Sequence, residues 1–500
     1  MSYVLIFPNT LFEQNDLIKK GSTVLLLEHP VFFERYAYHK MKIVLHRASM
    51  KSYESYIKKK YKCKTEYVNF DKVDGCLRKM KNKALDIYDP VDHLVEADVR
   101  AQCKKHNIDL TIHDTKLFME KKADLLSYAK KNKTGTFNHA AFYAYQRKKY
   151  SILLKKDGKP LGGKWSFDIK NRLPFPNRIK NYKPKVKSGA FIKEAISYVD
   201  KFFPNNPGTT DNFIYEIDHA GAKRAFDSFL KTQLSNFGPY QDAVSSDIPF
   251  GFHSMLSSSL NIGLITPEYV ITESEKFGRK NKIRQESLEG FIRQILGWRS
   301  IVYMLYCTNR TKMEKSNHFN HTRKLDKDVW YSSEYSTGFD VIDSMIDKTI
   351  DYAYLHHIER LMYVGNFLLI NQISPKDCFE WFMCMFIDSY NWVMYANVYA
   401  MSQYSTGKFL MTRPYFSSSN YIHKMSSYKK QKGSNTINLD GEDYEWYEVW
   451  DALYYNFISE NRTEFKKNYA IAAQVKHLDS KTAKQKRDVS NLAKLYFDEY

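Results

Sequence analysis

The segment TIDYAYLHHIERLM, from Thr349 to Met362, carries the pattern around which the fold prediction is built. Apolar residues recur in it at intervals of three and four, which predicts a helix with one buried stripe. The second of two adjacent histidines, His357, falls on this stripe, and His356 lies one turn before Arg360. We therefore expect two imidazoles and a guanidinium at one end of a pocket, although a buried structural histidine beside a surface one would give the same pattern.

The same helical spacing continues through the C-terminal half of the chain. Apolar residues recur at i, i+3 and i+4 in six long segments, at 190–203, 221–237, 287–306, 342–369, 375–390 and 443–460. These segments are longer than strands and predict a large all-α domain over residues 189–475. The final stretch, 476–500, is polar until a last amphipathic turn, and we expect it to be peripheral.

The first 130 residues follow a different pattern, which predicts an α/β doubly wound domain. Short apolar runs at 3–7, 23–27, 43–45 and 109–112 predict buried parallel strands, and residues 51–62 and 90–106 predict helices. The ligand crevice of such a sheet lies beyond the carboxyl ends of its strands, near Asn9 and Glu28. Neither GxGxxG nor GxxxxGK[ST] occurs, so a Rossmann fingerprint or a Walker loop is not the expected means of binding.

Residues 131–188 connect the two domains and are rich in glycine, proline and charge, which predicts an irregular linker. Its basic residues are interleaved with Phe142, Tyr143, Tyr145 and Trp165, an arrangement that suits either a nucleic-acid backbone or a solvated linker. Over the chain, 76 Lys and Arg oppose 56 Asp and Glu, a net charge of +20. This charge fits a polyanionic partner, but the lysines are dispersed, as they would be in any basic protein.

The cysteines and the N-terminus predict an intracellular protein. Six cysteines occur without a CxxC pair, which favours free thiols in a reducing compartment of the cytoplasm, nucleoid or nucleus. The N-terminus has no basic region before its apolar start, so we expect no signal peptide. No apolar run is long enough to span a bilayer, and no membrane association is predicted.

Eight stretches, taken in order, resemble the photolyase-related branch of the cryptochrome and photolyase family. They are HKMKIVLHRASMKSY (39–53), GGKWSFD (162–168), FGPYQD (237–242), FHSMLSSSLNIGLITP (252–267), EGFIRQILGWR (289–299), AYLHHIERLM (353–362), FIDSYNWVMYANVYAMSQY (386–404) and RPYFSSSNYIHKMS (413–426). The resemblance covers nearly the whole chain. It implies an α/β antenna-type domain and a helical domain that binds FAD. It also implies that the protein is a monomer and that its partner is ultraviolet-damaged DNA.

The resemblance implies a set of FAD-binding residues, each of which taken alone could equally be a helix cap, a surface pair or a core residue. The set comprises Ser254, Ser257 and Asn261 at i, i+3 and i+7, then Glu289, Gln294, Trp298 and Arg299 on the next matching helix, Arg360 after the histidines, and Asp388, Asn391 and Asn397 in the segment around the isoalloxazine. Which of the last three faces the flavin N5 atom is left open.

Members of the repair branch use light-excited reduced FAD to pass an electron to a pyrimidine dimer that is flipped out of the duplex. A (6-4) lesion also requires proton transfer, which an imidazole performs near neutral pH. His356 and His357 match the active-site pair of the family, and His357, expected to be the buried one, is the candidate acid. Tyr415 and Tyr421 match aromatic positions of the lesion pocket, or are structural tyrosines in a turn.

These matches predict light-driven repair of ultraviolet photoproducts, with (6-4) lesions as the expected substrate. Three alternatives are a blue-light photoreceptor of the cryptochrome type, a cyclobutane dimer photolyase, and a nucleic-acid-binding relic. The histidine pair and the basic linker speak against the photoreceptor, and the polar residues of the FAD set speak against the relic.

One departure from the family concerns its iron–sulfur cluster. The iron–sulfur members place one cysteine before the histidine helix and three after the KMS turn. This chain has no cysteine between Cys307 and Cys378 and none after Cys384. Four thiolates are needed, so we predict no cluster and no other metal site. Lys429 and Lys432 stand about where the ligands would be, and we expect them to contact DNA.

Two further departures concern electron transfer and the antenna. Trp381 matches the family's tryptophan near the flavin, but Phe382 stands where tyrosine is common. Any photoreduction route must therefore use Trp381, Trp392 or Tyr390. These three aromatic residues could equally be present for ordinary core packing. Family members can hold a lumazine-type pigment at the N-terminal crevice, here near Asn9 and Glu28, but Asn9 stands where an acidic residue is often found.

Overall fold

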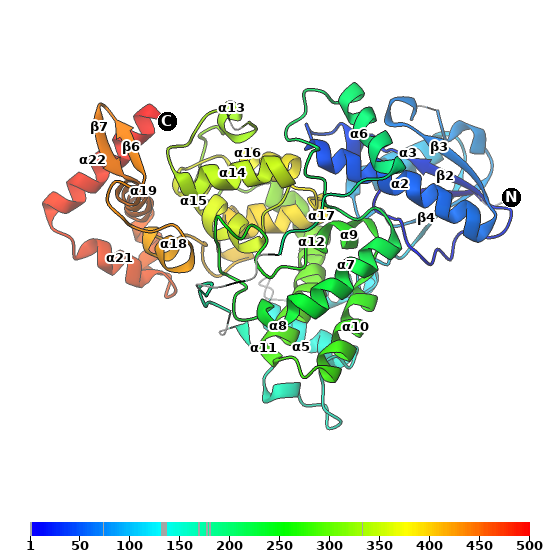
Figure 1. Cartoon of the computed structure of the whole chain (residues 1–500), viewed down its shortest axis with the longest axis horizontal. Coiled ribbons are helices and arrows are strands. Elements are labelled where there is room, and N and C mark those ends of the chain that lie inside the picture. Colours follow the sequence, from blue (N-terminus) through cyan, green and yellow to red (C-terminus); the bar gives the residue numbers. More distant parts are fainter. Residues whose placement is uncertain are drawn as a thin grey trace.

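The computed structural model describes residues 3–73, 75–131, 138–168, 171–176, 179, 182–332 and 334–500. An N-terminal α/β region is followed by a largely helical region, as the two hydrophobic patterns predict (Figure 1). The five-stranded sheet lies at one end of the molecule, drawn in blue, and the C-terminal helices lie at the opposite end, drawn in orange and red. The helices α7–α17 occupy the space between these ends.

The sheet is entirely parallel, with the order β3-β2-β1-β4-β5. Its strands are β1 (Tyr3–Ile6), β2 (Thr23–Leu27), β3 (Lys64–Val68), β4 (Ala84–Tyr88) and β5 (Asp109–His113). In the central strands Val4 pairs with Val24 and Leu5 with Ile87, and all four side chains are fully buried. Helices cover both faces of a parallel sheet, which explains the unbroken apolar runs of β1 and β2. The strand order reverses between β1 and β4.

One predicted strand is wrong. Residues 43–45 lie inside the 22-residue helix α2 (Lys40–Tyr61), which begins at a cap where His39 Nδ1 accepts a hydrogen bond from the Met41 amide. Every residue of α2 from Met41 to Met50 is buried. This half of the helix therefore has no solvent-facing polar side, and its sequence lacks the alternation of apolar and polar residues by which a surface helix is recognised. The mixed sequences KTEYV and ALDIY of β3 and β4 gave no strand signal.

The segment expected to be an irregular linker contains a helix. Besides α2, the first 150 residues contain the helices α1 (Pro30–Phe33), α3 (His93–Lys105), α4 (Lys122–Lys131) and α5 (His139–Lys149), and α5 lies in the expected linker. Phe142 and Tyr143 of α5 are 1% exposed, and Gln146 Nε2 donates to the Leu296 carbonyl oxygen at 2.9 Å. Two aromatic residues considered for nucleic-acid stacking are therefore core residues that pack on the helical region.

The helical region follows the predicted segments, with local interruptions. Its helices are α6 (Ala190–Phe202), α7 (His219–Thr232), α8 (Leu234–Phe237), α9 (Ser257–Ile262), α10 (Pro267–Lys280), α11 (Gln285–Arg293), α12 (Arg299–Lys315), α13 (Lys327–Trp330), α14 (Asp340–Tyr352), α15 (Asn366–Ile370), α16 (Pro375–Met385), α17 (Asn391–Met394), α18 (Ser419–Met425), α19 (Trp446–Glu460), α20 (Arg462–Lys466), α21 (Ala472–Asp479) and α22 (Ala483–Glu499). Three π-helical segments, Gln294–Trp298, Glu359–Gly365 and Tyr395–Ser402, widen the helices locally. Such segments are frequent at functional sites.

The C-terminal end contains a hairpin and a docked helix. Strands β6 (Thr436–Leu439) and β7 (Glu442–Glu445) pair antiparallel just before α19. Helix α22 packs against α19, and its Tyr496 is 3% exposed and 5.8 Å from the Phe339 ring. The segment expected to be peripheral therefore contributes side chains to the core.

A buried ion pair ties α2 to the sheet and to α6. Arg47 Nη1 lies 2.8 Å from Glu28 Oε1, and the two side chains are 7% and 0% exposed. Arg47 also contacts Glu194 of α6 at 2.5 Å, and its guanidinium lies 3.5 Å from the centre of the Tyr198 ring. One guanidinium therefore joins three elements that are distant in sequence.

Replacing Arg47 with Met should destabilise the protein, because the buried Glu28 carboxylate would lose its cation. We expect a loss of about 3–5 kcal/mol, measured as a lower Tm and a lower midpoint of chemical denaturation. The matched control is Lys58→Met on the same helix. The Lys58 side chain is 53% exposed in its pair with Glu54, and such a surface pair is worth about 1 kcal/mol or less. Equal effects of the two substitutions would contradict this role of Arg47.

Candidate functional site

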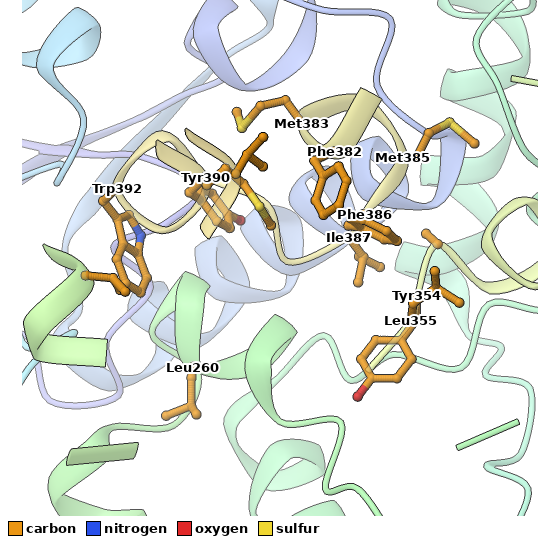
Figure 2. Close-up of a cluster of buried hydrophobic side chains, with 14 of the residues drawn as sticks. Leu260, Tyr354, Leu355, Phe382, Met383, Met385, Phe386, Ile387, Tyr390 and Trp392 are labelled. Atoms are coloured by element: carbon orange, nitrogen blue, oxygen red, sulfur yellow. The ribbon is translucent and has the colours of Figure 1, made fainter. Parts of the chain in front are cut away.

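A pocket opens in the helical region between α9, the α11–α12 helix pair, residues 354–361 and the segment that follows α16. Its empty volume, including the open mouth, is about 1360 Å³. Apolar side chains such as Phe291, Val302 and Phe382 form much of its wall. Figure 2 shows a cluster of buried hydrophobic side chains at this wall, and of the residues labelled there Leu260, Tyr354, Leu355, Phe382 and Trp392 line the pocket. The pocket is large enough for a dinucleotide-sized ligand.

Most of the predicted cofactor residues line this pocket. They are Ser254, Ser257, Asn261, Gln294, Trp298, Arg299, Arg360, Asp388 and Asn397. Trp392 and His357 line it as well. Residues from four separate sequence stretches, 254–261, 294–299, 357–360 and 388–397, therefore converge on one cavity.

Two of the predicted cofactor residues lie outside the pocket lining. The Glu289 carboxylate accepts hydrogen bonds from the Phe167 amide at 2.9 Å and from Arg293 Nε at 3.1 Å, so it holds the GGKWSFD stretch against α11. Asn391 Nδ2 donates to Asp92 Oδ2 at 2.8 Å. Both side chains therefore bind other parts of the protein and hold in place segments that carry pocket residues.

The histidine segment is not the continuous helix that its spacing predicts. Helix α14 ends at Tyr352, Ala353 takes a left-handed conformation with φ of 50°, and helix resumes only at His357. The break rotates the residues that follow it. His356 is consequently buried, at 3% exposure, whereas His357 is exposed toward the pocket. The prediction that His357 is the buried member of the pair is wrong.

A chain of hydrogen bonds connects three walls of the pocket. Arg360 holds Asp388 through two bonds, Nη1 to Oδ1 at 2.9 Å and Nη2 to Oδ2 at 3.3 Å. The Asp388 carbonyl oxygen accepts from Asn261 Nδ2 at 2.8 Å. Arg299 Nη1 in turn donates to Asn261 Oδ1 at 2.6 Å. Two guanidinium groups are thereby fixed beside the cavity.

Two nitrogen atoms at the cavity point to a polar ligand. Among the residues that the structure describes, none accepts a hydrogen bond from Arg299 Nε or from Trp392 Nε1, although both atoms are buried. Burial lowers the pKa of Arg299 to about 9, against the opposing effect of Asp388. Buried donors without acceptors are costly, so an acceptor on a bound molecule would relieve both.

A third imidazole, which the sequence analysis missed, stacks on the histidine pair. The rings of His253 and His356 are 4.2 Å apart and nearly parallel, at 11°. Burial lowers the pKa of both imidazoles well below its ordinary value, and their proximity adds to the effect on His253. Surrounding protein and then Arg360 lower the pKa of His357 to about 4. All three imidazoles are therefore neutral at pH 7. The FHS motif contained this signal, because His253 directly precedes the pocket residue Ser254.

Other predicted residues lie away from the cavity. Tyr415 and Tyr421 are half-buried and are outside the pocket lining, and the Tyr421 ring lies 6.2 Å from the Tyr363 ring. Lys432 is exposed. Lys429 Nζ donates to the carbonyl oxygens of His423 and Ser426, both at 2.8 Å, which folds its side chain onto the KMS turn.

The aromatic residues considered for electron transfer are packed in two groups. Trp381 is fully buried, its Nε1 donates to the Trp330 carbonyl oxygen at 2.7 Å, and its ring lies 5.5 Å from the pocket residue Phe382. The Tyr390 hydroxyl instead pairs with His46 Nε2 at 2.8 Å. Trp381 is thus one ring removed from the cavity, whereas Trp392 lines it.

The residues considered for an antenna have mainly internal partners. The Glu28 carboxylate accepts hydrogen bonds from Arg47 Nη1, the hydroxyls of Tyr67 and Tyr198, and the Phe70 amide. Asn9 Nδ2 donates to the Pro90 carbonyl oxygen. The carboxylate of Glu28 is therefore used to hold the N-terminal region together.

Two general properties can be stated for the described ranges. No three His, Cys, Asp or Glu side chains in them are grouped as metal ligands would be. No helix in them combines the length and the apolar composition that crossing a bilayer requires.

Comparisons with known proteins establish the family. The model of the deoxyribodipyrimidine photo-lyase-related protein family matches residues 4–215. The (6-4) photolyase of Agrobacterium fabrum is 30% identical over 473 residues, which cover 91% of this chain and 90% of that protein. The chain therefore belongs to the cryptochrome and photolyase family.

Solved structures agree on the fold. A bacterial class III photolyase from Agrobacterium tumefaciens superposes with a TM-score of 0.55 at 15% identity, over 85% of this chain and 86% of that chain. The cryptochrome of Synechocystis superposes with a TM-score of 0.56 at 13% identity, over 98% of this chain and 94% of that chain. The sheet followed by the helical region is thus the photolyase-like fold.

The lowered pKa of His357 predicts a pH dependence of stability. Between its ordinary pKa of 6.5 and the folded value of about 4, the unfolded chain binds more protons than the folded one. The free energy of unfolding therefore falls as pH falls through this window. The decrease in Tm from pH 7 to pH 5 should be smaller in His357→Gln than in the parent protein. His477→Gln, on the surface of α21, is the control and should show the same decrease in Tm as the parent. An equally large decrease in His357→Gln would contradict the lowered pKa of His357.

Proposed function

We propose that this protein is a light-driven DNA repair enzyme that uses FAD and acts on (6-4) photoproducts. The observation that carries the proposal is the position of His357, which lines the same pocket as nine residues matched to the FAD set. The family membership and the 30% identity to a (6-4) photolyase support the same reaction.

The pocket residues fit FAD in size and in charge. Arg299 would supply positive charge against a pyrophosphate, and Arg360, paired with Asp388, would be the cation on the flavin side. The unpartnered Arg299 Nε and Trp392 Nε1 would supply donors for polar atoms of the ligand. Ser254, Ser257 and Asn261 would hold the phosphates and ribose, while Asp388 and Asn397 would face the isoalloxazine. The apolar wall around Phe382 would keep water away from the ring. Reduced FAD, when bound and excited by light, supplies the electron that opens the lesion.

The three imidazoles have different tasks in this proposal. His357 faces the cavity and is neutral at pH 7, so it can take up the proton of the lesion hydroxyl and return the same proton to the lesion as the oxygen moves between the two rings. His356 lies behind it, stacked on His253, and its amide donates to Glu359 Oε2 at 2.8 Å. Glu359 is held by Lys348 at 2.7 Å. The buried pair Lys348–Glu359 therefore fixes the turn that presents His357.

Positive charge supports DNA as the partner. The chain carries a net charge of +20, and Lys432, in the insert after the KMS turn, is exposed. Lysines near a phosphate backbone gain affinity by releasing counterions. A flipped pyrimidine dimer would enter the pocket mouth beside His357.

Blue-light repair of defined lesions tests the proposal. The parent protein should repair (6-4) photoproducts, and His357→Ala should lower the rate by at least about 100-fold, the low end of general acid–base effects. The variant should keep its FAD content and its affinity for damaged DNA. His477→Ala is the matched surface control and should repair at the parent rate.

Two results would contradict the proposal in different ways. Repair of (6-4) lesions by His357→Ala at the parent rate would remove the proton role of that histidine. A parent protein that repaired only cyclobutane dimers, or no lesion at all, would refute the (6-4) assignment itself.

A further inference from the structure

Three consecutive residues of the pocket segment are held by the N-terminal region. Ser389, Tyr390 and Asn391 follow Asp388, and each makes a hydrogen bond to a different N-terminal side chain. The partners are Lys42 and His46 of α2 and Asp92 at the start of α3. We call these three side chains the domain clamp. The residues on either side of the clamped tripeptide, Asp388 and Trp392, both line the pocket.

Lys42 makes the densest contact of the clamp. Its Nζ donates to the Ser389 carbonyl oxygen at 2.6 Å, the Ser389 hydroxyl at 2.7 Å and the Met383 carbonyl oxygen at 3.3 Å. The side chain is 1% exposed and lies over the rings of Tyr38 and Tyr390. Three acceptors match the three donors of an ammonium group. Lys42 therefore fixes the conformation of the chain between Met383 and Ser389.

The other two contacts fix the far end of the segment. His46 Nε2 meets the Tyr390 hydroxyl at 2.8 Å, and Asp92 Oδ2 accepts from Asn391 Nδ2 at 2.8 Å. Asp92 also caps α3, through Oδ1, and follows Val91, which has a φ of 55°. A β-branched residue in this conformation is strained. The Val91 amide donates a hydrogen bond to Asp89 Oδ1 at 2.7 Å, which stabilises the strained conformation.

The pocket wall therefore depends on contacts from another region of the chain. Asp388 is the partner of Arg360, and its carbonyl oxygen is the acceptor for Asn261. A shift of Ser389 would move Asp388, and a shift of Asn391 would move the Trp392 indole. Burial lowers the pKa of Lys42 to about 7, while nearby Cys384, Asp388 and Asp92 raise it, so the pocket carboxylate Asp388 is one of the groups that act on the charge of this lysine.

We propose that Lys42 is a positioning residue for the cofactor pocket, and that the N-terminal region thereby sets the affinity and the redox potential of the bound flavin. This inference rests on the proposed FAD site. It assigns the N-terminal α/β region a role in shaping the flavin environment that is independent of any antenna pigment.

The test compares Lys42→Met with Lys51→Met, a lysine of the same helix that lies over the Tyr67 ring and away from the clamp. The FAD dissociation constant and the flavin midpoint potential are measured for both variants and for the parent. Loss of hydrogen bonds from one amine should raise the dissociation constant of Lys42→Met about tenfold or more. Its midpoint potential should also shift, which a change confined to stability would not produce. Lys51→Met should match the parent in both measurements.

A milder variant decides the matter if Lys42→Met does not fold. Ser389→Ala removes one acceptor of Lys42 and leaves the backbone contact, so it should raise the dissociation constant by a smaller factor. The inference would be overturned if folded Lys42→Met had the FAD dissociation constant and the midpoint potential of the parent. If only Ser389→Ala folds, parent values in that variant would overturn it. Either result would leave the proposed FAD site intact. A parent protein that binds no FAD would instead refute the proposed function.

Discussion

The ion pair between Arg360 and Asp388 is the interaction on which the pocket depends. Its side chains are 12% and 9% exposed, and Arg360 also donates to the Leu355 carbonyl oxygen and lies 3.9 Å from the centre of the Phe386 ring. The broken helix at residues 353–356 and the segment after α16 are thereby joined, and Asn261 and Arg299 connect the pair to α9 and α12. Removing one partner of such a buried pair costs about 3–5 kcal/mol.

The pocket is not a property of the helical region alone. Arg47 joins α2 to the sheet and to α6, and the domain clamp on the same helix extends this scaffold to the residues beside the ion pair. Helix α2 is buried on all sides over its first half because it serves both regions. This double role explains both the apolar run at 43–45, which resembles a strand, and the buried basic residues on either side of it, Lys42 and Arg47.

The sequence predicted the fold class and most of the pocket, and its errors have physical causes. Central strands and long amphipathic helices were found because one repeating pattern determines them, and nine residues of the pocket lining were found because motifs in the same order as in the family placed them. The break at Ala353 was missed because a left-handed alanine gives no sequence signal, and it inverted the exposure of His356 and His357. The internal contacts of Glu289, Asn391 and Glu28 depend on partners far away in sequence, such as Asp92 for Asn391, which no local pattern reveals.

The absorption spectrum of the purified protein, with the flavin released by heat, tests the central claim that this pocket holds FAD. The account predicts a yellow protein whose flavin bands show resolved structure from a dry site, with FAD in the supernatant after denaturation. The same spectrum should be weaker in Asp388→Ala at equal protein concentration, because Arg360 would lose its partner. A colourless, well-folded parent protein that releases no flavin and takes up none from solution would contradict the account.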